Sequence, residues 1–110
     1  MASSQVMTSL GTGQNHLDGT TYFASLAGSL VGTATAEARA QNVVRDAGTF
    51  RNLFVYSPTN TASVSSTITL RNNLLDTALT ITYTADQTGI KEDTTNSVAV
   101  IATDECNWEI

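Results

Sequence analysis

Residues 64–84, VSSTITLRNNLLDTALTITYT, contain two short runs in which apolar residues alternate with Ser or Thr. A period of two is typical of a β-strand with one buried side and one solvated side. Asn72-Asn73 lies between the runs, and asparagine tolerates the left-handed backbone that a tight hairpin turn demands. The pattern predicts a β-hairpin in which Leu70 and Leu79 face the core and the threonines face outwards.

Runs of the same kind recur along the chain, separated by turn residues every 8 to 12 residues or so. The expected strands are 20–26, 34–41, 49–57, 64–70, 79–83, 90–95, 98–102 and 106–110, with Ala27–Gly32 as a loop and Asn96 as a turn. Many short strands with regular turns are typical of a sandwich or jelly roll. We therefore expect an all-β fold: a single jelly-roll-like β-sandwich of about eight antiparallel strands, formed by residues 19–110.

Two of these segments have unusual faces. In 34–41, alanines alternate strictly with polar residues, which favours a strand, although the same residues are good formers of a short helix. In 49–57, Leu53 and Val55 point one way, while Phe50, Phe54 and Tyr56 are expected to point the other way. Such a strand is covered on both sides, so we expect a second subunit or the amino-terminal arm on its outer face.

Residues 1–18 are rich in Ser, Thr, Gly, Gln and Asn, with Val6, Met7 and Leu10 as isolated apolar points. Such a stretch cannot bury enough apolar surface to fold by itself. It is either a frayed terminus or an extended arm that becomes ordered on a neighbouring subunit. We expect the arm.

Charged residues make up only 14% of the chain, whereas threonine contributes 19 of the 110 residues. Hydroxylated strand faces suit contacts with other proteins, because few charges must lose their water. The formal charge is −5 and no basic cluster is present, so nucleic acid is not an expected partner. We expect neither a signal peptide nor a membrane span, and expect the chain to be soluble in the cytoplasm where it is made.

Residues with reactive or metal-binding side chains are isolated in the sequence. His16 is the single histidine and has no ligand-like spacing to other residues. Glu92-Asp93 could offer oxygen atoms to calcium, but neighbouring strand residues face opposite sides, so a turn-forming role is favoured. Cys106 alternates with Trp108, and both are expected to be buried. We expect no enzyme, no metal site and no cofactor.

Residues 36–110 resemble a β-sandwich module that recurs in structural proteins of tailed phages. The matching features are Ala47-Gly48-Thr49 with Leu53 and Val55, Thr69-Leu70-Arg71-Asn72 with Asp76-Thr77-Ala78-Leu79-Thr80, and Asp93-Thr94-Thr95-Asn96 with Val98 and Val100. The resemblance implies a jelly roll, commonly trimeric, that serves as a capsid cement (decoration) protein or as a domain of a fibre or spike. It implies no catalytic residues. The chain has a polar arm and no fibre shaft, which favours a protein that sits on a shell.

The function expected from this resemblance is cementing the capsid from its exterior. The chain, made in the host cytoplasm, would bind the major capsid protein where its subunits meet. The candidate contact residues are Gln5, Val6, Met7, Leu10, Phe50, Phe54 and Tyr56. The alternative is a fibre or spike head that recognises a glycan or host receptor through an exposed aromatic side chain, namely Tyr22, Tyr56 or Trp108.

Overall fold

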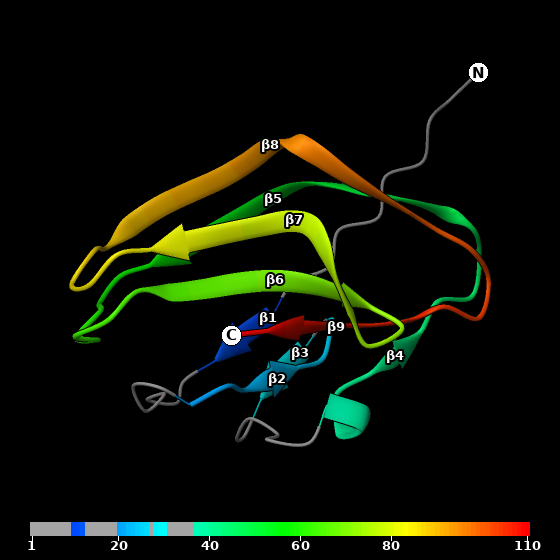
Figure 1. The fold of residues 1–110 in the computed structure, drawn as a ribbon, viewed down its shortest axis with the longest axis horizontal. Coiled ribbons are helices and arrows are strands. Elements are labelled where there is room, and N and C mark those ends of the chain that lie inside the picture. Colours follow the sequence, from blue (N-terminus) through cyan, green and yellow to red (C-terminus); the bar gives the residue numbers. More distant parts are fainter. Residues whose placement is uncertain (1–9, 13–19, 27, 31–36) are drawn as a thin grey trace.

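A computed structural model describes residues 10–12, 20–26, 28–30 and 37–110 (Figure 1). This part of the chain is all-β, as predicted, apart from one 3-10 turn. The elements in chain order are β1 (Leu10–Thr12), β2 (Phe23–Ala24), β3 (Gly28–Leu30), η1 (Glu37–Arg39), β4 (Asn42–Val43), β5 (Gly48–Ser57), β6 (Ser66–Asn72), β7 (Leu75–Tyr83), β8 (Gly89–Val100) and β9 (Glu105–Glu109).

The strands form one larger sheet and two strand pairs. The larger sheet has the order β2-β9-β6-β7, with β4 also paired to β9, and all of its pairings are antiparallel. β5 and β8 form an antiparallel pair, and β1 and β3 form a parallel pair. Figure 1 shows β5 and β8 running alongside β6 and β7. The arrangement resembles a sandwich.

The core lies between the β5–β8 pair and the larger sheet. Leu70, Leu79 and Cys106 are almost completely buried, and Trp108 is buried beside them. Val100 adds to this cluster from β8. The predictions that Leu70 and Leu79 face the core and that Cys106 and Trp108 are buried are confirmed. The hairpin pattern was informative because one face of β6 and β7 is covered and the other is wet.

The tight turn of the predicted hairpin lies one residue later than expected. Asn72 pairs with Leu75, so the two turn residues are Asn73 and Leu74, with φ of 50° and 67°. Both residues adopt the left-handed conformation that a two-residue hairpin connection requires. Asparagine tolerates this conformation, whereas leucine is strained in it.

Two expectations near the amino end were wrong, and a third was confirmed only in part. Within 34–41, residues 37–39 form the 3-10 turn η1 instead of a strand, which agrees with the helical preference of the sequence. Residues 28–30, expected in a loop, form β3, whose parallel partner β1 contains Leu10. Of the strand predicted at 20–26, only Phe23–Ala24 is a strand, although the backbone of Tyr22 also exchanges two hydrogen bonds with Ile110.

β8 is a single long strand, whereas two strands and a turn at Asn96 were expected. Arg51 pairs with Ser97 but Leu53 pairs with Asp93, so three residues of β8 oppose the one residue Asn52, whose φ is 58°. This bulge bends the strand without ending it (Figure 1). It also shifts the alternation of β5, so that Phe50 packs against the core on the same side as Leu53. The prediction that Phe50 shares a face with Phe54 and Tyr56 was therefore wrong.

Candidate interaction surfaces

Two neighbouring strands place large apolar side chains on the outer face of the β5–β8 pair. Phe54 is 57% exposed, Tyr56 63% and Ile90 59%. Tyr56 lies directly opposite Ile90 in the antiparallel register, and Phe54 is two residues away along β5. Residues opposite and two apart share one face of a sheet. We call Phe54, Tyr56 and Ile90 the β5–β8 face.

The β5–β8 pair is anchored on β7 by side chains. The hydroxyl of Tyr83 donates its proton to a pair of backbone carbonyls, that of Gly89 at 2.7 Å and that of Val55 at 3.1 Å. Burial raises the pKa of Tyr83, so its phenol keeps this proton across a wide pH range. The ammonium of Lys91 donates to the carbonyl of Thr82 at 2.7 Å. These contacts place the β5–β8 face on a fixed support.

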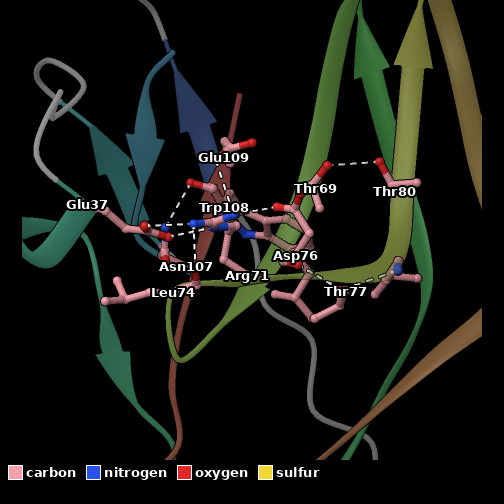
Figure 2. Close-up of polar contacts among 12 residues, drawn as sticks. Glu37, Thr69, Arg71, Leu74, Asp76, Thr77, Thr80, Asn107, Trp108 and Glu109 are labelled. Atoms are coloured by element: carbon pink, nitrogen blue, oxygen red, sulfur yellow. Dashed lines mark hydrogen bonds and ion pairs between the residues drawn. The ribbon is translucent and has the colours of Figure 1, made fainter.

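The outward face of the β6–β7 hairpin carries hydroxyl groups, as the sequence predicts, although Thr69 on this face is buried. Thr67 and Thr82 face each other with 3.0 Å between their Oγ1 atoms, and Thr69 and Thr80 do so at the same separation. The second pair is drawn in Figure 2. Cross-strand threonine pairs of this kind stabilise a hairpin without adding charge.

Arg71 is the centre of an ion-pair cluster at the base of the hairpin turn (Figure 2). Its guanidinium donates to both carboxylate oxygens of Glu37, at 2.8 and 3.0 Å, and to the carboxylate of Asp76. The Glu109 carboxylate lies 3.6 Å away, and the backbone carbonyl of Leu74 accepts a further bond at 2.7 Å. The hydrogen bonds from Arg71 lower the pKa of Glu37, and those carboxylates raise the pKa of Arg71. The cluster ties η1, β7 and the turn to β6.

Two buried or half-buried aspartates bind backbone donors instead of offering free ligands. Asp93 accepts bonds from the backbone N–H groups of Thr95 and Asn96, and the Asn96 side chain lowers its pKa most. Asp93 thus binds local backbone donors, as a turn-forming residue would, but it does so in the bulge of the continuous strand β8 and not in the predicted turn. Asp104 accepts from the backbone of Ile101, which is the main reason for its lowered pKa. Within the described ranges, no group of three or more His, Cys, Asp and Glu side chains could hold a metal ion.

A second group of exposed apolar side chains lies at the end of the molecule where the hairpin turns. Its members are Val43, Leu74, Leu75 and Ile101. Leu75 is 70% exposed, and Leu74 is 51% exposed in a strained backbone conformation. We call Leu74 and Leu75 the hairpin tip. The sequence alone did not indicate this tip, because two leucines beside a strand look like core residues. The preceding Asn72-Asn73 was the signal that they belong to a turn.

The predicted contact residues have different positions in the structure. Gln5, Val6 and Met7 lie outside the described residues, as does His16, and Leu10 is in β1. Phe50 packs on the core, whereas Phe54 and Tyr56 are brought together on the β5–β8 face. Among the described residues, no helix is long and apolar enough to cross a membrane.

Comparisons with known proteins gave no match. No family model, no curated protein and no solved structure is significantly similar to this chain.

Proposed function

We propose that this chain is a non-enzymatic structural protein that binds other protein subunits through its β5–β8 face. The observation that carries this proposal is the exposure of Phe54, Tyr56 and Ile90 side by side on paired strands. Aromatic residues are enriched at the centres of protein interfaces, and each buries roughly 150–250 Å² when covered. A rigid strand pair presents these side chains with little loss of backbone freedom on binding.

The assembly we propose is a trimer that cements a tailed-phage capsid from outside. Its support is the resemblance of residues 36–110 to phage β-sandwich modules, and the jelly-roll connectivity is part of the same proposal. The β5–β8 face makes the contact between subunits, and the arm formed by residues 1–18, whose Leu10–Thr12 pair with β3 of the same chain, binds the major capsid protein. Three arms on one particle raise the effective concentration of each, so no single contact needs to be strong.

The experiment replaces the β5–β8 face with small polar residues. We expect wild-type protein to form a trimer by light scattering and to co-pellet with empty phage shells. A Phe54→Ser, Tyr56→Ser variant should no longer form the trimer and should lose most of its shell binding. The control is Leu75→Ser, which also replaces an exposed apolar side chain by serine. Leu75 lies at the end of β7 opposite to Tyr83, which anchors the β5–β8 face, so this change should leave the trimer intact. A monomeric wild-type chain, or a variant that remains trimeric, contradicts the proposed role of this face.

One observation supports the alternative role, a fibre or spike head that binds a glycan. Tyr56 is 63% exposed, as a sugar-stacking ring must be, whereas Trp108 is buried and does not offer its ring. Binding to a glycan array that is abolished by Tyr56→Ala and kept by Tyr56→Phe would support this alternative over the cement role.

A further inference from the structure

In the hairpin tip, Leu74 is unfavourable both in its backbone conformation and in the exposure of its side chain. Leu74 has φ of 67° at a turn position that glycine or asparagine fills without strain, and it also exposes half of an apolar side chain. Leu75 beside it is the most exposed large apolar residue in the described part of the chain. Residues that combine a strained backbone with an unfavourably exposed apolar side chain are typical of binding sites.

A hollow of about 520 Å³ opens close to this tip. Its floor is apolar and is formed by core residues, Leu26, Phe50 and Val100. Its rim includes Gly48, where a Cβ atom would meet nothing within 4 Å, and the exposed side chain of Arg45. A space of this size is large enough to receive apolar side chains from another molecule.

The tip and the hollow lie on either side of the start of β9. On one side, the backbone N–H of Asn73 donates to the carbonyl of Glu105. On the other side, Val43, which lines the hollow, pairs with the same Glu105. Figure 1 shows the β6–β7 turn, β4 and the end of β8 at the same end of the molecule. A protruding feature and a hollow on one surface can be exchanged between two copies related by a two-fold axis.

The hollow carries a cation, and the tip stands on an acidic cluster. Glu37, Asp76 and Glu109 surround the single cation Arg71, so the cluster under the tip carries a net charge of −2 (three carboxylates against one guanidinium). Arg45 on the rim of the hollow forms no ion pair within the described residues, and Asp46, which is also exposed, lies beside it in the lining of the hollow.

We infer that two copies of this chain associate end to end, each placing Leu74 and Leu75 in the hollow of the other. Arg45 of each copy then meets the acidic base of the other tip. This contact does not use the β5–β8 face, so it holds whether or not that face forms a trimer.

Cysteine cross-linking tests the contact directly. Chains carrying Leu75→Cys are mixed with chains carrying Gly48→Cys under mild oxidation. We expect a disulfide-linked pair of the two different chains at twice the chain mass, at a yield several-fold above that of either variant alone. The native Cys106 is completely buried and its pKa is raised by that burial, so it does not compete. A yield no higher than that of the single variants overturns the inference.

Three further variants separate binding from folding. Leu75→Ser removes the tip, and each lost leucine contact should weaken self-association by about tenfold or more. Gly48→Leu should weaken it to a similar extent by filling the hollow, while the melting temperature of the monomer stays the same or rises. Leu74→Asn keeps the turn conformation and removes the apolar contact. The measurement is the dissociation constant from sedimentation over a range of concentrations.

The outcomes distinguish this inference from the proposed function. Loss of self-association in the tip and hollow variants, with the Phe54→Ser, Tyr56→Ser variant still cross-linking, supports the end-to-end contact. Unchanged self-association in Leu75→Ser overturns it, and a simultaneous loss of shell binding would assign the tip to the shell protein instead.

Discussion

Replacement of Arg71 by leucine should lower the free energy of unfolding by about 3 kcal/mol at neutral pH. Breaking a buried ion pair costs about 3–5 kcal/mol, because the remaining charge loses its partner. The side chains of Arg71 and Glu37 are 16% and 12% exposed, so water screens the loss only partly and the low end applies. The measurement is urea unfolding, with Arg51→Leu on the exposed surface of β5 as the control, expected to change stability by less than about 0.5 kcal/mol.

The effect of Arg71→Leu should shrink as the pH falls. Arg71 holds the pKa of Glu37 below its ordinary value, so the wild-type stabilisation is present above the unfolded pKa of about 4.3 and is lost as the pH falls through the lower folded value. In the variant, burial without a cation raises the pKa of Glu37. Protonation of Glu37 at low pH then removes the unpaired charge and restores part of the lost stability. We expect the difference to fall from about 3 kcal/mol at pH 7 to about 1 kcal/mol near pH 3. Equal differences at both pH values would refute an ion-pair origin.

Three other changes test the core, the anchor and the cysteine. Leu70→Ala should cost about 2–5 kcal/mol by urea unfolding because Leu70 is fully buried, whereas Leu75→Ala should cost under about 1 kcal/mol. Tyr83→Phe should cost about 1–2 kcal/mol, while Tyr56→Phe on the surface should be neutral. Cys106 should react with a thiol reagent only after unfolding, because it is fully buried and its pKa is raised; rapid labelling of folded protein would contradict its position in the core.

Alternation along the chain was sufficient to predict those strands in which one face is buried and the other is solvated. β6 and β7 meet this condition, and Leu70 and Leu79 lie where the pattern places them. In β9 the pattern was incomplete, because Asn107 is buried together with Cys106 and Trp108 on either side of it. Its side chain lowers the pKa of Glu37 in η1, a residue 70 positions earlier in the chain that no local pattern could indicate as its neighbour.

Alternation also explains the positions of some of the candidate contact residues in β5. Phe54 and Tyr56 follow the simple alternation of β5 and lie together on its outer face, where both are exposed. Phe50 does not follow it, because the bulge at Asn52 shifts the alternation of faces between Phe50 and Phe54. A bulge depends on the partner strand, and here Asp93 supports it by binding the backbone of Thr95 and Asn96 across the three extra residues of β8. The turn-forming residues can be recognised in the sequence, but their pairing register with β5 cannot be predicted from it.

β7 determines how the two proposed contacts can be used together. Leu75 begins this strand and Tyr83 ends it, and eight steps of about 3.4 Å place the two ends at most about 27 Å apart. Tyr83 supports the β5–β8 face through Val55 and Gly89, whereas Leu75 belongs to the hairpin tip. Occupation of one surface therefore leaves the other accessible. A chain that forms a trimer through the β5–β8 face still presents one tip and one hollow per subunit, and three such ends per trimer are enough to connect trimers into a continuous network.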